Sequence, residues 1–131
     1  MSRSGYIDDM DNHWQLIRWR GAVASAIRGK RGQAFLKEML AALDALPEKR
    51  LIADELEDEG AVCAIGSVGK SRGLDMTGVD PHDPESVAGA FSVSEALARE
   101  IVYENDEGSY KRETPEQRFD RMRVWVVNHI R

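Results

Sequence analysis

Eight residues in the middle of the chain have the types and spacing of a loop that binds phosphate. The segment Ala64-Ile65-Gly66-Ser67-Val68-Gly69-Lys70-Ser71 fits the loose form of this motif, with alanine in place of the first glycine. Glycines would let backbone N–H groups turn toward phosphates, Lys70 would reach the terminal ones, and Ser71 would hold Mg²⁺. A nucleotide-binding enzyme at Gly66, Lys70 and Ser71 is therefore one functional hypothesis.

The surroundings of this segment argue against a nucleotide site. The apolar run at residues 61–63 is short for a buried parallel strand, and residues 72–78 make a poor helix, although phosphates need a helix N-terminus. The chain also lacks the alternating strands and helices of a doubly wound sheet. Nucleotide binding is thus the weakest of three hypotheses, and we expect no cofactor.

Charge is strongly segregated along the 131 residues. Residues 1–50 carry 9 Lys/Arg and 6 Asp/Glu, residues 51–110 carry 3 and 14, and residues 111–131 carry 6 and 3. The blocks have net charges of +3, −11 and +3, and the whole chain has −5. Either these blocks neutralise one another in the fold, or the acidic middle is presented to a partner.

Acidic residues of the middle block concentrate at two places. If these places share a face, the protein offers an anionic surface to a basic partner, for example a protein that handles DNA or RNA. The alternative is a solvated surface that only aids solubility. The residues predicted to contact the partner are Asp54, Glu55, Glu57, Asp58, Glu59, Glu104, Asp106 and Glu107.

A basic stretch near the N-terminus interleaves an aromatic residue, Trp19, with cations. Such residues can contact phosphates and stack on a base. Alternatively, Trp19 belongs to a core stripe and the cations line a solvated side of a helix. A small nucleic-acid-binding regulator is the second hypothesis, and its contacts would be Arg18, Arg20, Arg28, Lys30 and Arg31.

The histidines and the cysteine form no recognisable site. His13, His82 and His129 lack metal-binding spacing, so we expect no metal site. His129 is expected to be a partly buried residue near the end of a helix. Cys63 is the only cysteine; it suits a reducing cytoplasm and is expected to be a small buried apolar residue.

These side chains must be positioned by helices, because the hydrophobic pattern is predominantly helical. The clearest helix covers residues 33–46, where Phe35, Met39 and Ala42 recur at helical spacing and Pro47 prevents continuation. No apolar run reaches the ~20 residues that a membrane span needs.

A second helix is expected over residues 13–28, with an apolar stripe that begins at Leu16. Gly21 lies in its interior, where glycine costs about 1 kcal/mol relative to alanine. We therefore expect a neighbouring helix to approach closely at Gly21. Gly29 and Gly32 are expected to stop this helix.

Capping signals predict the later elements. Asp83-Pro84 opens a helix to residue 91, Ser92–Glu95 opens one to residue 104 before a break at 105–109, and Thr114-Pro115 opens one to residue 129. Residues 51–64 read as a strand, a turn at 58–60 and a returning strand, with a helix over 49–57 as the alternative. Residues 63–72 are either a helix or a loop.

The predicted fold is therefore mainly α: a compact orthogonal bundle of five to six helices, with room for one small β-hairpin near residues 50–64. It would be a single helical domain over residues 1–131, in which residues 1–10 form a flexible arm. A homodimer through an exposed Trp14 or Trp125 is left open.

Several segments, read together, prompt a family resemblance. They are Trp14 with residues 17–29, and residues 51–53, 62–66, 103–107 and 113–116. Through them the chain resembles a group of short, uncharacterised proteins of tailed bacteriophages and prophages. The resemblance implies a phage context, in which accessory proteins of this size often bind and redirect host proteins, including defence complexes.

The leading hypothesis combines this context with the acidic residues. It describes a non-enzymatic phage protein in the cytoplasm of the host cell, which covers a basic surface on a host protein. Inhibition of a nucleic-acid-processing defence system, of the anti-CRISPR or anti-restriction type, is one specific form of this hypothesis.

Overall fold

The computed structural model describes residue 3, residues 13–109 and residues 111–131. Within these ranges it contains six helices and one two-stranded antiparallel sheet, which confirms the predicted mainly α bundle with a small hairpin. The elements are α2 (His13–Arg28), α3 (Lys30–Ala45), β1 (Glu57–Asp58), β2 (Ala61–Val62), α4 (Ala64–Arg72), α5 (Pro84–Phe91), α6 (Glu95–Glu107) and α7 (Pro115–His129).

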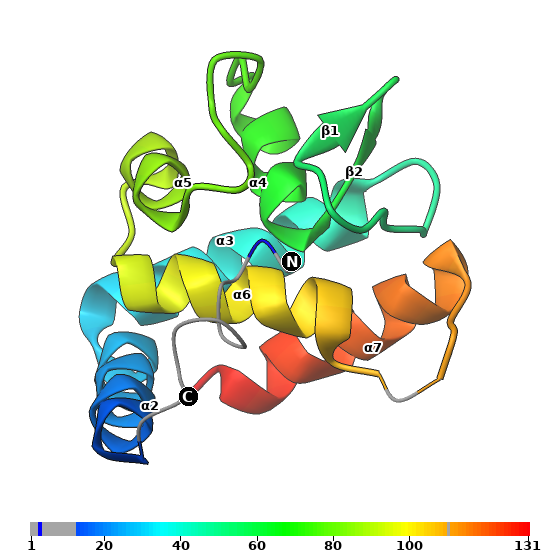
Figure 1. Cartoon of the computed structure of the whole chain (residues 1–131). Helices are drawn as coiled ribbons and strands as arrows, with labels where there is room; N and C mark the ends of the chain where they lie inside the picture. The colour runs from blue at the N-terminus through cyan, green and yellow to red at the C-terminus, as the bar shows by residue number, and fades with distance from the viewer. Residues whose placement is uncertain (1–2, 4–12, 110) are drawn as a thin grey trace.

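Two helices organise the packing. α3 packs against α2, α4 and α7, and α6 packs against α2, α4, α5 and α7. Figure 1 shows α6 crossing the molecule, with α5 and the hairpin on one side of it and α7 on the other. Leu36, Met39 and Leu43 of α3 are fully buried, as are Ile101 of α6 and Met122 of α7. The apolar stripe of α3 is thus the centre of the core.

The corner between α2 and α3 differs from the prediction. Gly29 alone separates the two helices, and Gly32 lies inside α3, where a Cβ atom would overlap the carbonyl oxygen of Ala26. Gly32 therefore allows close packing instead of stopping a helix.

Gly21 differs from Gly32. Apart from its own helix and its chain neighbours, no described atom lies within 4 Å of the position that a Cβ atom would take at Gly21. Leu16 of the same helix is 41% exposed. Within the described residues, the expected close neighbour at Gly21 is not found. The predicted stripe of this helix is confirmed at Val23 and Ile27, which are buried, and at Trp19, which packs partly buried against the core, but not at Leu16.

Local capping signals placed two helices correctly, and the structure settles a third segment that the sequence left open. α5 begins at Pro84, with Asp83 accepting a hydrogen bond from the backbone of Glu85. α7 begins at Pro115 and has a complete capping box, in which Thr114 and Gln117 bond each other's backbone N–H groups. Residues 64–72 form α4, so this segment is a helix.

The boundary between α5 and α6 was predicted incorrectly. Ser92 caps the C-terminus of α5 with φ 58°, and Ser94 is the N-cap of α6. α6 also continues through Asn105 to Glu107, because the Asn105 side chain is buried and hydrogen-bonded inside the fold. A polar residue expected to end the helix is instead part of its inner face.

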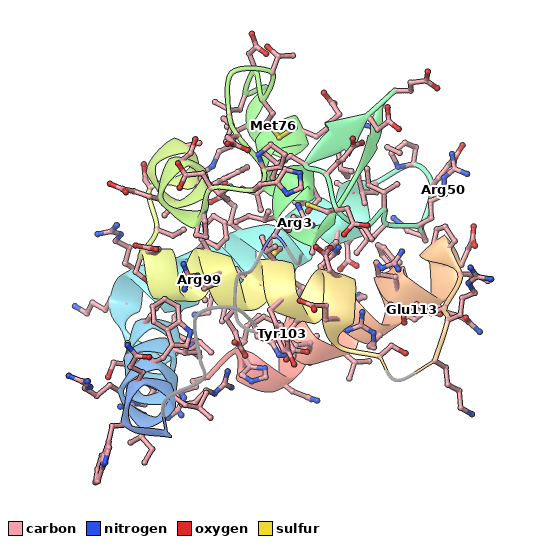
Figure 2. All side chains as sticks on the ribbon, viewed as in Figure 1. Arg3, Arg50, Met76, Arg99, Tyr103 and Glu113 are labelled. Carbon is pink, nitrogen blue, oxygen red and sulfur yellow. The ribbon has the colours of Figure 1, made fainter. Side chains whose placement is uncertain are left out.

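The predicted flexible arm is contradicted at one position. Arg3 is 3% exposed, and Figure 2 shows it beside α6, on the side toward α4. The other residues of the predicted arm lie outside the described ranges. No described helix has the length and apolar character needed to cross a bilayer.

Candidate functional site

The first acidic cluster forms a tight β-hairpin, which we call the acidic hairpin (residues 54–62). Glu57 pairs with Val62 and Asp58 with Ala61. The two-residue turn between them has positive φ angles, 51° at Glu59 and 86° at Gly60, as the commonest two-residue hairpin turns require. The predicted turn is confirmed, although the first strand begins at residue 57 instead of residue 51.

The base of the acidic hairpin is anchored in the core. Leu56 is 4% exposed, and its carbonyl accepts the N–H of Cys63 at 3.2 Å. A Cβ atom at Gly66 of α4 would overlap that same carbonyl oxygen. The hairpin therefore rests directly on the backbone of α4, which fixes its position.

Asn105 of α6 adds a second attachment. Its side chain donates to the carbonyl of Ile52 at 2.9 Å and accepts the N–H of Ala64 at 3.0 Å. The two bonds join the chain before the hairpin to the start of α4. The sequence does not indicate this role, because Asn105 and its acidic neighbours have the composition of a helix end.

The carboxylates of the acidic hairpin all reach solvent. Each of the five residues is exposed, and none forms an ion pair with any residue in the described ranges. The arginines of the two basic blocks are therefore not used to neutralise this cluster, whose members are Asp54, Glu55, Glu57, Asp58 and Glu59.

The second acidic cluster is largely turned inward. The Asp106 side chain is 5% exposed and accepts two hydrogen bonds from Arg3, at 2.5 and 2.8 Å. It also accepts the backbone N–H of Asp54 at 3.2 Å. Asp106 is therefore a structural residue next to the acidic hairpin, and we remove it from the predicted partner contacts.

Glu104 and Glu107 are partly buried. Burial, reinforced by the charge of Glu100, raises the pKa of Glu104 above its usual value. The exposed anionic surface thus consists of the acidic hairpin and does not extend evenly over both predicted acidic clusters, residues 54–59 and residues 104–107.

A surface hollow of about 190 Å³ lies between the acidic hairpin and the loop that follows α4. Glu55 and Glu57 line it together with Met76 and Val79. Met76, which Figure 2 labels near the top of α4, is almost fully buried. The hollow therefore combines an apolar wall with exposed carboxylates, an arrangement that only the fold creates.

The phosphate-loop hypothesis fails on geometry. Residues 64–69 are buried within α4, and the N–H of Gly66 bonds to Sγ of Cys63 at 3.4 Å. Lys70 donates to the carbonyl of Gly60 at 3.1 Å, so it braces the hairpin turn. The only described sheet is antiparallel with two strands. No strand-to-helix loop exists there to cradle a phosphate.

The basic residues of the second hypothesis do not act as one group. Arg20 forms a two-point ion pair with the buried Glu100, at 2.8 and 3.2 Å. Arg31 donates to the carbonyl of Ser92 at 3.0 Å. The remaining members, Arg18, Arg28 and Lys30, are exposed. Two of the five cations are thus engaged within the fold: Arg20 joins α2 to the middle of α6, and Arg31 joins α3 to the end of α5.

The other candidate side chains have structural positions. Cys63 is buried at the N-cap of α4, and His129 is partly buried and stacks on Trp125 with ring centroids 4.3 Å apart. Both positions confirm the predictions for these residues. Among the described residues, no group of three or more His, Cys, Asp or Glu could hold a metal ion.

Comparison with known proteins gives no match. No protein-family model, no curated protein and no solved structure matches the chain significantly.

Proposed function

We propose that this protein is a non-enzymatic binding protein whose acidic hairpin covers a basic surface on a partner protein. The observation that carries the proposal is the anchored hairpin itself, with five exposed carboxylates that have no ion-pair partner in the described ranges. Like charges held this close repel one another, and a basic partner relieves that repulsion.

The rigidity of the acidic hairpin supports a binding role. Its base bonds to the start of α4, and Lys70 holds its turn at the carbonyl of Gly60. A surface that is already ordered loses little conformational entropy when it binds. The same attachments would not be needed for a segment that only aids solubility.

The hollow beside the hairpin suits a basic side chain. Lysine and arginine have apolar stems and charged heads. Met76 and Val79 would contact such a stem, while Glu55 and Glu57 would attract its head. A partner arginine or lysine seated there would add shape selectivity to the attraction between the two surfaces.

The partner we propose is a host protein that handles nucleic acid. Such proteins carry basic surfaces for phosphates, and a rigid row of carboxylates can occupy that surface in place of phosphates. The resemblance to short phage proteins supplies the context, in which inhibition of a host defence system in the cytoplasm is the specific form of the proposal.

The experiment compares two neutralised variants with the wild type. The test variant carries Glu57→Gln, Asp58→Asn and Glu59→Gln. The control changes three exposed acids elsewhere by the same chemistry, Glu95→Gln, Glu116→Gln and Asp120→Asn. Each protein is immobilised and exposed to bacterial lysate, and retained proteins are identified and purified for binding measurements at several salt concentrations.

We expect a retained protein that binds the wild type and the control alike and loses at least about tenfold in affinity for the test variant. Its affinity should fall as salt rises. Equal binding by the test variant, or retention of no protein in a salt-sensitive way, would refute the proposal.

A further inference from the structure

The backbone of β1 has an open edge at Glu57. Glu57 pairs with Val62, and the N–H of Cys63 donates to the carbonyl of Leu56 at 3.2 Å. In an antiparallel ladder, a bond between the residues flanking a pair marks that pair as one without hydrogen bonds of its own. The two paired residues then direct their N–H and C=O groups away from each other. Glu57 therefore turns both of these groups away from β2.

The opposite edge of the acidic hairpin is already occupied. The carbonyl of Val62, which points away from β1, accepts the N–H of Ile52 at 2.9 Å. No hydrogen bond from another described residue reaches the N–H or C=O of Glu57. Within the described chain, β2 is thus bonded on both sides, and β1 is bonded on one side only.

The hollow of about 190 Å³ lies beside β1, between it and the loop that follows α4. Figure 1 shows this loop and β1 on the same side of α6. The loop is ordered by its own bonds, since the N–H of Thr77 donates to Asp75 at 3.0 Å and the N–H of Val79 to the carbonyl of Met76 at 3.1 Å. A chain that entered the hollow would therefore find its backbone partners on β1.

The charges at this edge select what can pair with it. Glu55 and Glu57 are exposed, line the hollow and lie two positions apart, a spacing that puts side chains of an extended chain on one face. Like charges directly opposite each other destabilise a strand pair. An acidic strand, including β1 of a second copy, is thus disfavoured, as are the phosphates of a nucleic acid, whereas a basic strand is attracted.

We propose that the partner protein adds an extended segment to the open edge of β1, and that this segment carries lysine or arginine at every second position. The proposal rests on the proposed function and specifies how the partner's basic surface meets the acidic hairpin. The backbone of the segment would bond to the N–H and C=O of Glu57, and its basic side chains would lie opposite Glu57 and Glu55. Main-chain bonds supply affinity in such strand addition, and alternate side chains supply specificity.

The length of the edge sets the expected strength. β1 has only two residues, and very short edge strands limit pairing. The backbone bonds should therefore fix the orientation of the added segment, while opposite charges steer its approach. An isolated segment should bind weakly, and its binding should decrease as salt rises.

Two synthetic peptides of identical composition test the spacing. The first is Thr-Lys-Thr-Lys-Thr-Lys-Thr, in which all lysines lie on one face of a strand. The second is Thr-Thr-Lys-Lys-Lys-Thr-Thr, with the same charge and the same strand-favouring threonines. Each is titrated into the wild-type protein at low salt and followed by NMR. We expect the alternating peptide to bind at least about fivefold more tightly.

Hydrogen exchange at single amides tests the backbone contact. When the alternating peptide is bound, the N–H of Glu57 should exchange at least about fivefold more slowly, because it is then held in a hydrogen bond. The N–H of Thr77, which is already bonded to Asp75, serves as the internal control and should keep its exchange rate.

Two substitutions at one position separate the N–H from the charge. Glu57→Gln removes the charge and keeps the N–H, whereas Glu57→Pro removes both. Proline is tolerated on an edge strand where the N–H faces away from the ladder, so Glu57→Pro should keep the fold, which circular dichroism checks. It should bind the alternating peptide at least about fivefold more weakly than Glu57→Gln does. The exchange measurement on the wild type holds even where this variant is misfolded.

The outcomes distinguish this proposal from the proposed function. Equal binding of the two peptides, with an unchanged exchange rate at Glu57, would overturn strand addition. If the variant with Glu57→Gln, Asp58→Asn and Glu59→Gln then lost both peptides, the hairpin would attract cations through side chains alone and the proposed function would stand. Failure of both peptides to bind the wild type in a salt-sensitive way would count against both proposals.

Discussion

Arg3 and Asp106 form a buried ion pair across 103 residues of sequence, with Nε of the guanidinium 2.5 Å from Oδ2 of the carboxylate. The Arg3 side chain is fully covered, and Asp106 also accepts the backbone N–H of Asp54. The pair therefore ties the N-terminal end of the chain to α6 at the point where the acidic hairpin begins.

Removing the charge of Asp106 should be costly. Asp106→Asn leaves a buried guanidinium without its counter-ion, which typically costs about 3–5 kcal/mol. The free energy of unfolding in urea measures this loss. Asp120→Asn makes the same chemical change at an exposed position of α7, where we expect a change within about 0.5 kcal/mol. A similar small change for both variants would show that Arg3 is not held as described.

Two glycines in helices should respond oppositely to the same substitution. A Cβ at Gly66 would overlap the carbonyl oxygen of Leu56, and neither backbone can move without disturbing the hairpin. Gly66→Ala should therefore destabilise by about 3 kcal/mol or more. Gly89 of α5 is exposed, and apart from its own helix and chain neighbours no described atom lies within 4 Å of the position that a Cβ atom would take there. Gly89→Ala should therefore stabilise the protein by up to about 1 kcal/mol.

Thermal unfolding of both alanine variants checks this prediction. The two proteins differ from the wild type by one methyl group each, so propensity alone would make both more stable. A stabilised Gly66→Ala variant would contradict the close contact between α4 and the base of the hairpin.

The sequence predicts those parts of the fold whose signals are local. The capping box at Thr114 fixed the start of α7 because both of its bonds join Thr114 to Gln117, close by in the chain. The glycines show where this reasoning ends. The sequence predicted a neighbouring helix at Gly21 and a helix end at Gly32, whereas among the described residues it is Gly32 that faces a neighbouring helix. The direction in which a glycine faces depends on how the helices pack, which local sequence does not encode.

In the candidate site, too, some features follow from the local sequence and others depend on contacts between distant parts of the chain. Exposure of the five acidic residues in the segment 54–59 follows from their density of charge, since so many carboxylates cannot be buried together. The burial of the Asp106 side chain in an ion pair could not be predicted, because its partner Arg3 is 103 residues away in the sequence. The hollow lined by Met76 could not be predicted either, since it exists only where the loop after α4 passes the hairpin.

Glu104 should destabilise the folded protein at neutral pH. Burial and the charge of Glu100 raise the pKa of this carboxyl above its ordinary 4.5. The folded state then binds a proton more readily than the unfolded state, so stability falls as pH rises through that raised pKa. Glu104→Gln should be more stable than the wild type at pH 7, and this advantage should vanish at pH values below the ordinary pKa.

Urea unfolding of Glu104→Gln at a series of pH values measures the effect. The matched comparison is Glu116→Gln, at an exposed glutamate in the first turn of α7, which should show no such stabilisation. An advantage of Glu104→Gln that persists unchanged in acid would mean that the substitution acts through packing and not through charge.

Glu113 should show the opposite sign. Its carboxylate accepts two hydrogen bonds from Arg121, at 2.7 and 3.0 Å, and lies 3.3 Å from Arg118; Figure 2 labels it on the loop between α6 and α7. The hydrogen bonds from Arg121 lower the pKa of Glu113 below its ordinary 4.5. The folded state therefore holds the carboxylate charged, and the stabilisation is present above the ordinary pKa and lost as pH falls through the lowered one.

Glu113→Gln should cost about 1.5–3 kcal/mol at pH 7, the usual value for hydrogen bonds to a charged group. The difference from the wild type should stay constant above the ordinary pKa of 4.5 and shrink as the pH falls through the lowered pKa, where the wild-type carboxylate takes up its proton. Unfolding in urea across this range measures it. Glu104→Gln and Glu113→Gln are the same chemical change. At neutral pH the free energy of unfolding should be above the wild type for Glu104→Gln and below it for Glu113→Gln, and both differences should shrink in acid. Opposite signs of this kind would show that the two electrostatic environments, and not a general effect of glutamine, cause the changes. Curves with the same sign would contradict the assignment of Arg121 to Glu113.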